Sequence, residues 1–238
     1  MKELLETAVS DAQWSSVTAI IPRWKRFVDL LCIVLSLPLL LPVVLIIVLG
    51  IKIVSPGPIL FSQERVGFLG RRFKCWKFRS MKVGVETKIH KEHAAQLMHS
   101  ESPWAKLDKS GDPRLIPLGA LLRASGLDEL PQLINVWNGE MSLVGPRPCT
   151  PYEFEKYLPW QRERFDSLPG LTGLWQVSGK GKTTFGEMIN LDIRYVRNMS
   201  PWQDLIIISK TVPVLVAQLG EVLRRTQQAG KSTAQKQT

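Results

Sequence analysis

Two acidic side chains, Asp128 and Glu129, stand side by side in a segment that is otherwise rich in leucine, glycine, proline and arginine. Arg123 precedes Asp128 by five residues, and Arg147 follows within the tetrapeptide GPRP. Such a set suits phosphate chemistry, because one carboxylate can bind Mg²⁺ beside phosphate oxygens while the other acts as a base or nucleophile. Glycine-rich turns in residues 169–182 add backbone amides that can approach phosphate oxygens. The pattern therefore indicates chemistry on a phosphate group.

A predicted helix over residues 128–138 positions the acid pair. Its apolar residues recur at helical spacing and a glycine ends the pattern: Leu130, Leu133, Ile134, Trp137 and Gly139. With Asp128 as the N-cap, Pro131 falls in the first turn, where the backbone N–H has no intrahelical partner in any case. Acids are also favoured at helix starts for capping alone, so the position by itself does not require a function.

The overall composition favours a membrane-associated protein. The chain of 238 residues is long enough for one globular domain, and its net charge of +10 favours a polyanionic partner such as nucleic acid, an anionic membrane or a phosphorylated substrate. The uncharged apolar run at residues 30–51 favours the membrane. The three cysteines have no paired spacing and predict neither a disulfide framework nor a zinc site.

The apolar run has basic residues on both sides, so the positive-inside rule favours neither orientation. Pro38 and Pro42 lie near its middle, where each removes a backbone donor and kinks a helix. A single-pass helix and a re-entrant helix that returns to the same face both fit these residues. Asp29 at the entrance needs a partner, and we expect Arg26 or Arg23 to supply it.

The remaining residues predict a mixed α/β fold that is mostly helical. Residues 58–61 and 72–78 are expected to be extended, residues 114–124 helical, and the polar stretch 83–111, which holds the three histidines, a mobile loop. Residues 199–226 begin with a strong helix start at Ser200 and are divided by Pro213. That segment can lie flat at the membrane interface or pack on the domain.

Several long stretches, in this order, resemble the bacterial sugar transferases, which are monotopic phosphoglycosyl transferases: KRFVD (25–29), PGPILFSQERVG (56–67), FKCWKFRSM (73–81), DPRLIPLGALLRASGLDELPQLINVWNGEMSLVGPRP (112–148), PGLTGLWQV (169–177) and LDIRYVRNMS (191–200). The resemblance covers Trp24 to about Ser200. It implies transfer of a sugar 1-phosphate from a UDP-sugar to polyprenyl (undecaprenyl) phosphate, which gives a polyprenyl-diphospho-sugar and UMP. This is the first membrane step of surface polysaccharide assembly, and the sugar stays open.

The resemblance also implies a role for individual residues. Asp128 would be the nucleophile that forms a phosphosugar-aspartyl intermediate, and Glu129 would bind the Mg²⁺ cofactor. Further residues are implied to bind the substrate or its phosphates: Lys77, Arg79, Arg123, Arg147, Gln176, Asp192 and Tyr195. The apolar run would be re-entrant and broken at Leu41–Pro42, with Pro38 weakening the preceding turn.

The implied protein is the short form of the family, on the cytoplasmic face of the bacterial inner membrane. Its expected parts are an N-terminal extension (1–22), a re-entrant membrane helix-break-helix (23–54), a small globular catalytic domain (55–198), an interfacial amphipathic segment (199–226) and a disordered tail (227–238). The oligomeric state stays open, a homodimer included.

Two other classes of protein compete with an enzyme. A non-catalytic basic adaptor on the membrane explains the charge and the apolar run, but not the acid pair beside GPRP. A nucleic-acid binder needs aromatic residues interleaved with lysine and arginine on an exposed platform, whereas most aromatic residues here fit a core or an interface. We therefore expect no nucleic-acid partner.

Overall fold

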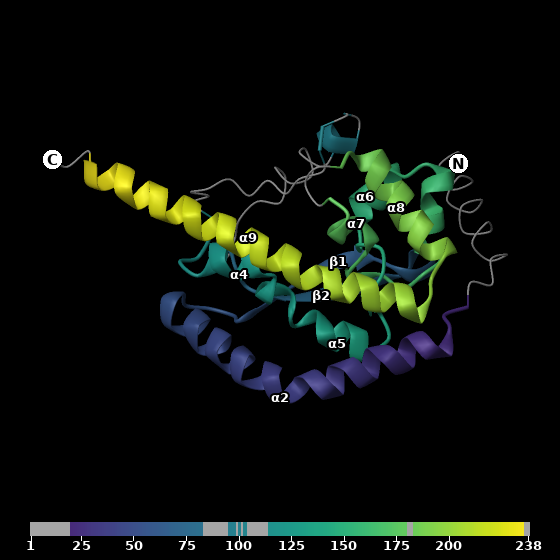
Figure 1. The fold of residues 1–238 in the computed structure, drawn as a ribbon, viewed down its shortest axis with the longest axis horizontal. Coiled ribbons are helices and arrows are strands. Elements are labelled where there is room, and N and C mark those ends of the chain that lie inside the picture. The colour runs from purple at the N-terminus through teal and green to yellow at the C-terminus, as the bar shows by residue number, and fades with distance from the viewer. Residues whose placement is uncertain are drawn as a thin grey trace.

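The computed structural model describes residues 20–82, 95–98, 100, 102–103, 114–179 and 183–235. Figure 1 shows a body of short helices and strands with two long helices, α2 along one edge and α9 across the body and beyond it. The fold is mixed α/β and mostly helical, as predicted from the sequence. The histidines at 90, 93 and 99 and most of the predicted loop 83–111 lie outside the described residues.

Two small sheets hold the centre of the body. The first pairs β1 (Leu60–Val66) with β2 (Arg72–Phe78) in antiparallel register, with Gln63 opposite Cys75. The turn between them contains η1 (Phe68–Gly70). β2 has the predicted bounds, while the extended stretch expected at 58–61 continues to residue 66 because it pairs with β2.

The second sheet joins β3 (Ser142–Val144) to β4 (Gly170–Thr172) in parallel. The two backbones approach so closely that glycine is required beyond the end of β3: a Cβ on Gly145 would lie 2.2 Å from the carbonyl oxygen of Leu168. This contact holds the GPRP loop against the glycine-rich segment, although the two are far apart in the sequence.

Short helices surround the sheets: α4 (Gly119–Ser125), η2 (Leu127–Glu129), α5 (Gln132–Trp137), α6 (Pro151–Lys156), η3 (Pro159–Phe165), α7 (Leu174–Val177) and α8 (Phe185–Arg197). The helix predicted over 114–124 begins only at Gly119. Its first residues instead form backbone hydrogen bonds with the chain after β2, where Lys82 donates to Arg114 and Ile116 donates to Ser80.

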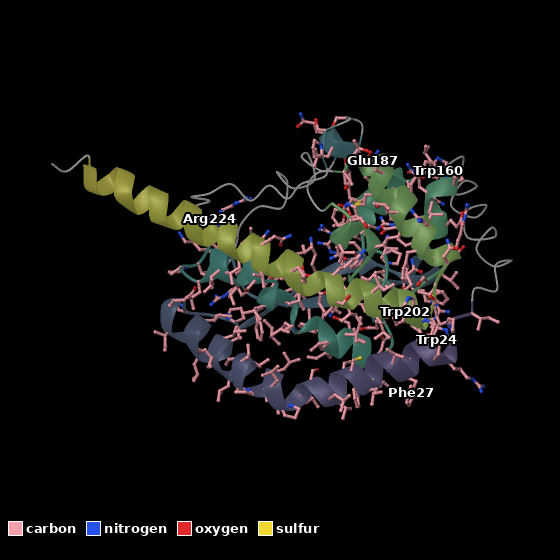
Figure 2. All side chains as sticks on the ribbon, viewed as in Figure 1. Trp24, Phe27, Trp160, Glu187, Trp202 and Arg224 are labelled. Carbon is pink, nitrogen blue, oxygen red and sulfur yellow. The ribbon has the colours of Figure 1, made fainter. Side chains whose placement is uncertain are left out.

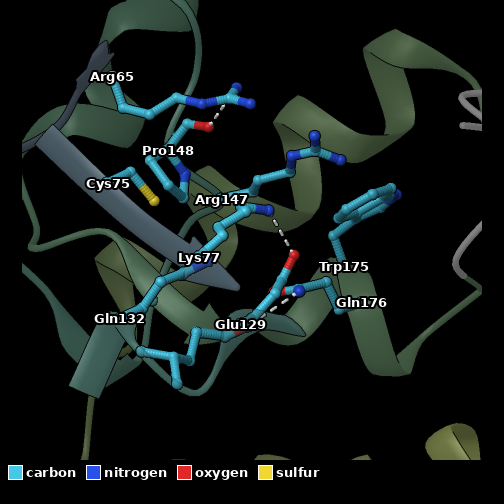
Figure 3. A pocket seen from close by; sticks show the side chains of 11 residues that line it. Arg65, Cys75, Lys77, Glu129, Gln132, Arg147, Pro148, Trp175 and Gln176 are labelled. Carbon is cyan, nitrogen blue, oxygen red and sulfur yellow. Dashed lines mark hydrogen bonds and ion pairs between the residues drawn. The ribbon is translucent and has the colours of Figure 1, made fainter. Parts of the chain in front are cut away.

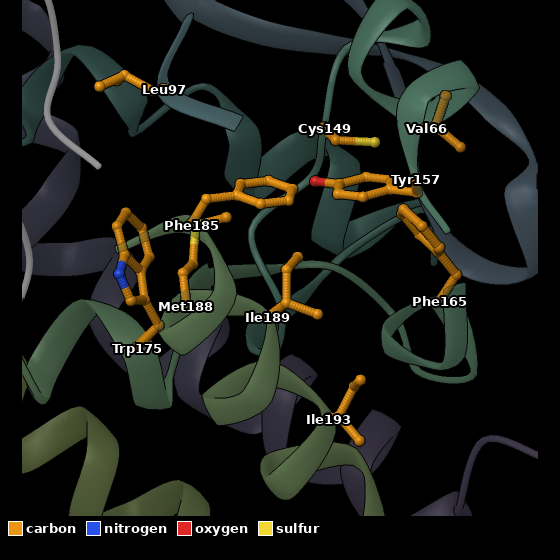
Figure 4. Packing of buried hydrophobic residues seen from close by; sticks show 10 residues of the cluster. All are labelled: Val66, Leu97, Cys149, Tyr157, Phe165, Trp175, Phe185, Met188, Ile189 and Ile193. Atoms are coloured by element: carbon orange, nitrogen blue, oxygen red, sulfur yellow. The ribbon is translucent and has the colours of Figure 1, made fainter. Parts of the chain in front are cut away.

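The largest core cluster packs α8 against α6, η3 and α7 (Figure 4). The rings of Tyr157 and Phe185 stack with their centroids 5.5 Å apart. Leu97 joins this cluster from a helical turn at 95–98, inside the stretch that was predicted to be a loop. Those four residues are therefore packed on the domain, because Leu97 finds apolar partners there.

The helix α2 (Arg23–Val54) is continuous, so the interruption predicted at Leu41–Pro42 is wrong. The helix bends near its middle instead (Figure 1), with both Pro38 and Pro42 inside it. Each proline removes only one backbone hydrogen bond, and the helix continues through both. By length and composition α2 could cross a membrane, and 11% of its most apolar window is buried in the protein.

Both ends of α2 pack against the same domain. Near its start, Ile33 packs in a buried cluster with Val136 and Met141. Near its end, Ile47 and Ile51 pack in a cluster with residues of β2 and α4. The apolar side chains between these contacts project away from the body (Figure 2), and many are exposed.

Asp29 does not form the ion pair predicted from the sequence. Its Oδ1 accepts hydrogen bonds from Ser142 Oγ at 3.0 Å and from the Leu143 amide at 2.9 Å. Arg26 donates to the backbone carbonyls of Val136 and Trp137. The entrance of α2 is thus tied to β3 and α5 by hydrogen bonds to the globular domain.

The last helix, α9 (Pro201–Gln235), starts as predicted, with Ser200 Oγ accepting a hydrogen bond from the Gln203 amide at 3.2 Å. Pro213 lies inside the helix without dividing it, and the helix continues beyond residue 226 to Gln235. Trp202 on α9 and Trp24 on α2 lie at the same end of the molecule (Figure 2).

Candidate functional site

An open pocket lies where β2, η2, the GPRP loop and α7 meet, with an empty volume of about 420 Å³ that includes solvent space at its mouth. Figure 3 shows charged and amide side chains from all four segments around it. The residues that line it are Arg65, Cys75, Lys77, Glu129, Gln132, Arg147, Pro148, Gly170, Leu171, Trp175 and Gln176. Four of the predicted site residues are therefore brought together: Lys77, Glu129, Arg147 and Gln176.

An ion pair lines the pocket. Lys77 Nζ on β2 lies 2.8 Å from Glu129 Oε1 on η2, and both side chains are partly exposed. β2 alternates its side chains between two faces, so Cys75 and Lys77 both face the pocket. Burial raises the pKa of the Cys75 thiol, which therefore stays uncharged and less reactive than a thiolate.

Asp128 lies beside this ion pair but does not line the pocket, and only 2% of its surface is exposed. The single helix predicted over 128–138 is wrong in its first part. Asp128 lies inside the short 3₁₀ segment η2, and α5 begins after Pro131. Pro131 has no N–H to continue an α-helical ladder, and the Leu130 amide bonds to Leu127 instead. The acid pair therefore sits on a tight turn rather than at the cap of a long helix.

The GPRP loop that carries Arg147 is held by a buried network. Arg164 Nη2 donates to the Arg147 carbonyl at 2.9 Å and to Asp192 Oδ2 at 2.5 Å. Arg164 Nη1 also donates to the Tyr157 hydroxyl. Asp192, predicted to bind substrate, is instead buried against Arg164. Burial raises the pKa of Asp192 to about 6, although the charge of Arg164 opposes that rise.

Three other predicted residues are not brought to the pocket. Arg79 donates to the carbonyls of Pro56 and Ser55 at 2.7 and 2.8 Å, just after the end of α2. Arg123 lies in the last turn of α4 and is not a lining residue. Tyr195 is buried on α8, where that helix meets α2 and α9.

Tyr195 belongs to what we call the anchor cluster, which consists of Lys25, Tyr195 and Asp204. Lys25 Nζ lies 2.7 Å from Asp204 Oδ2 and donates to the Tyr195 hydroxyl at 2.8 Å. The Tyr195 hydroxyl donates to Asp204 Oδ1 at 2.7 Å. Burial, and next the charge of Asp204, raise the pKa of Tyr195, so the phenol stays protonated. The cluster joins α2, α8 and α9.

Gln176 offers the pocket an acceptor. Its Nε2 donates to the Leu171 carbonyl at 3.1 Å. Its Oε1 is buried and has no hydrogen-bond partner among the residues that the structure describes. A ligand hydroxyl or amide could therefore satisfy this atom.

Arg65, Gln132 and Trp175 are among the lining residues that the sequence reasoning missed. Trp175 is fixed by a 2.7 Å hydrogen bond from its Nε1 to Thr183 Oγ1. Arg65 is one of many basic residues after the apolar run, so composition does not distinguish it. Strand alternation could have drawn attention to Arg65, because it places the side chains of Gln63 and Arg65 on the same face of β1.

The side chains present fit a magnesium ion only in part. Among the described residues there is no group of three or more His, Cys, Asp or Glu side chains. Asp128 and Glu129 are adjacent, however, and Mg²⁺ is usually bound by one or two carboxylates together with substrate phosphates and water. The donor set therefore fits an ion shared with a phosphorylated substrate.

Several known proteins are similar to this chain in sequence. The family model of the bacterial sugar transferases matches residues 20–218. The chain is 41% identical over 197 residues to the galactosyl transferase CpsE of Streptococcus agalactiae, covering 82% of this chain and 43% of that protein. It is 38% identical over 197 residues to the exopolysaccharide production protein ExoY of Sinorhizobium fredii, covering 82% of this chain and 87% of that protein.

A relative from Caulobacter vibrioides is named UDP-glucose:undecaprenyl-phosphate glucose-1-phosphate transferase. It is 39% identical over 200 residues, which cover 81% of this chain and 69% of that protein. The chain thus spans less than half of the streptococcal relative and most of the length of ExoY.

Proposed function

Because the chain belongs to the bacterial sugar transferase family, we propose that it transfers a sugar 1-phosphate from a UDP-sugar to undecaprenyl phosphate and releases UMP. One observation carries the proposal: the Lys77–Glu129 ion pair, whose Glu129 directly follows Asp128 in the chain, lines a pocket that also presents Arg65 and Arg147. Cations at this density suit a diphosphate, and the adjacent carboxylates suit the reaction at phosphorus.

The proposed reaction has two steps. The Asp128 carboxylate attacks the phosphorus next to the sugar, and the bond from that phosphorus to the bridging oxygen breaks, so that UMP leaves with the electron pair. The phosphate oxygen of the lipid then attacks the same phosphorus and releases the Asp128 carboxylate. An acyl phosphate is reactive enough for this second step, and the division lets a soluble donor and a lipid acceptor use one site in turn.

Asp128 must reach the pocket for this chemistry. It lies on a three-residue 3₁₀ segment between Gly126, which has a left-handed φ of 72°, and Pro131. In the proposed reaction this short segment turns so that Asp128 faces the pocket. Lys77 and Arg147 would offset the charge of the approaching carboxylate, and Glu129 would hold a magnesium ion that neutralises the phosphates when bound.

We also propose that α2 is re-entrant, with both ends on the cytoplasmic face of the bacterial inner membrane. Two groups of contacts support this. Lys25 near the start of α2 is bonded to Asp204 and Tyr195 in the globular domain, and Ile51 near its end is buried in the same domain. A straight helix of 32 residues is about 48 Å long and would separate its ends across a bilayer.

Labelling tests the topology. Arg23→Cys and Lys52→Cys place a thiol on an exposed position at each end of α2. In sealed spheroplasts, an impermeant maleimide should label neither position, and in inverted vesicles it should label both, above the background of the parent chain with Cys32, Cys75 and Cys149. Labelling of one position in each preparation would mean that α2 spans the membrane.

Intact mass tests the chemistry. The purified protein is incubated in detergent with Mg²⁺ and a panel of UDP-sugars, without lipid, beside Asp128→Asn. We expect an added mass of one sugar phosphate, absent from the variant and removed by undecaprenyl phosphate. Equal turnover in Asp128→Asn without an adduct would leave a direct-transfer enzyme. No adduct and no turnover with any UDP-sugar would favour the membrane adaptor.

A further inference from the structure

We propose that Arg65 binds the diphosphate of the donor together with Arg147, as a second guanidinium of the pocket. This inference rests on the proposed function, because it says which part of the UDP-sugar, the diphosphate, binds on this side of the pocket. Figure 3 shows both guanidinium groups on the same side of the Lys77–Glu129 pair.

Arg65 is a buried cation without a carboxylate partner. Only 8% of its surface is exposed, yet it lines the pocket. Its Nη2 donates to Gln63 Oε1 at 2.7 Å, and its Nη1 makes a long contact of 3.4 Å with the Pro148 carbonyl. Among the described residues, no carboxylate forms an ion pair with it. A buried charge is costly unless it is paired, so the site favours an anionic ligand.

A second buried arginine shows what a purely structural arrangement looks like. Arg79 likewise has no ion pair with a carboxylate of the described ranges, but it donates two short hydrogen bonds to backbone carbonyls near the negative end of α2. It does not line the pocket. Arg65 differs in both respects, because one of its protein contacts is long and the pocket is open beside it.

The charges that line the pocket match a diphosphate. Glu129 neutralises Lys77, which leaves the guanidinium groups of Arg65 and Arg147 as the remaining cations of the lining. Burial, and next the charge of Arg147, lower the pKa of Arg65, so these groups repel each other. Each phosphorus of a nucleoside diphosphate ester carries one negative charge, and a guanidinium can hold such a group through two parallel hydrogen bonds.

The contacts of Arg65 hold it next to the loop that carries Arg147. Pro148, whose carbonyl Arg65 approaches, directly follows Arg147, and Arg164 fixes the Arg147 carbonyl from the other side. The Arg65 guanidinium and the backbone that carries Arg147 are therefore placed before a donor arrives. Such preorganisation reduces the cost of ordering the side chains on binding.

Four variants test the inference in detergent or nanodiscs: Arg65→Gln, Arg65→Lys, Arg147→Gln and the Arg65→Gln/Arg147→Gln double variant. Arg72→Gln is the matched control, because Arg72 lies on the neighbouring strand and its ion pair with Glu64 is exposed to solvent. UDP affinity is measured by calorimetry, and KM is measured for both the UDP-sugar and undecaprenyl phosphate.

Arg65→Gln should raise the Kd for UDP and the donor KM by about 10- to 100-fold, the range for a hydrogen bond to a charged group. The lipid KM should stay within about twofold of wild type, since this charge acts on the donor. Arg65→Lys should recover part of the loss because it keeps the charge. If both arginines bind one diphosphate, the double variant should lose less than the product of the two single losses.

Three results would overturn the inference. Unchanged UDP affinity and donor KM in Arg65→Gln would overturn it alone, with the proposed function intact. An equal rise in the donor and lipid KM, with a lower Tm and no recovery by lysine, would assign Arg65 to stability. A wild-type protein that neither binds UDP nor turns over any UDP-sugar would overturn the proposed function and this inference with it.

Discussion

Positive charge is buried both in the anchor cluster and beside the pocket, and the two regions neutralise it to different extents. In the anchor cluster, Lys25 is fully buried and paired with Asp204 at 2.7 Å, and the Tyr195 hydroxyl bonds to both. In the pocket, Glu129 neutralises Lys77, but no carboxylate in the part of the chain that the structure describes pairs with Arg65. Acidic and basic side chains thus neutralise each other in one region and leave a guanidinium without an ion pair in the described part of the other.

This difference distinguishes charged side chains that stabilise the fold from charged side chains that can bind a ligand. A buried ion pair with all its hydrogen bonds made has nothing left for a ligand, and it ties together the segments that supply it. A buried guanidinium with weak protein contacts still has donors to offer. The resemblance implied a substrate-binding role for Tyr195 and none for Arg65, whereas the partners of the two side chains point the other way.

The largest expected effect is in the anchor cluster. Lys25→Met leaves the Asp204 carboxylate buried without its cation, so we expect the free energy of unfolding to fall by about 3–5 kcal/mol. Denaturant unfolding in detergent measures this change. In Lys25→Met/Asp204→Leu no charge is left unpaired, so the double variant should be more stable than the single one. An equal fall in the free energy of unfolding in both variants would mean that Lys25 stabilises the protein by something other than its ion pair with Asp204.

The next effect concerns the network behind Arg147. Asp192→Asn leaves Arg164 without its carboxylate and loosens its hold on the Arg147 carbonyl. We expect kcat/KM for the UDP-sugar to fall about 10- to 100-fold at pH 8, the range for a hydrogen bond to a charged group. A drop in Tm without any change in donor kinetics would limit Asp192 to a structural role.

The pH dependence of that network follows from the raised pKa of Asp192. The folded protein binds this proton more tightly than the unfolded chain does, so ionisation of Asp192 lowers stability as pH rises from the ordinary value of 3.8 to about 6. The ion pair with Arg164 is complete only above that range. The ratio of wild-type to Asp192→Asn kcat/KM should therefore shrink as pH falls below about 6, and a constant ratio would contradict this.

A smaller effect is expected at Arg79, which was predicted to bind substrate. Arg79→Gln removes hydrogen bonds to the Ser55 and Pro56 carbonyls, so the free energy of unfolding should fall by about 1–3 kcal/mol. The donor KM should not change. If the donor KM rises as much as in Arg65→Gln, the protein contacts of an arginine do not tell whether it binds the donor or only stabilises the fold.

The smallest effect is expected at the exposed surface. Arg72→Gln breaks a 3.4 Å ion pair with Glu64 in which both side chains are more than half exposed. We expect the free energy of unfolding to change by less than about 1 kcal/mol, because solvent screens such pairs. Thermal unfolding at low and high salt measures the difference, and a larger loss would show that β1–β2 pairing depends on this contact.

Local patterns predicted the elements that depend on near neighbours. The alternation of residues 72–78 predicted β2, and Ser200 followed by Pro201 predicted the start of α9, because strand faces and helix caps are set within a few residues. Some local features were still misread. Pro131 divides the predicted helix after η2, and the two prolines of α2 bend that helix rather than break it.

The sequence by itself determined the family, the long apolar helix, the adjacent acids and the basic excess, because these depend only on residue types and their order. Only the tertiary structure decided which charged side chains meet. β1–β2 pairing and the contact between Gly145 and the glycine-rich segment bring Arg65, Lys77 and Arg147 together, while Arg79, Asp192 and Tyr195 find partners elsewhere. Charge acts over a few ångströms, and those distances are set by chain segments that lie far apart in the sequence.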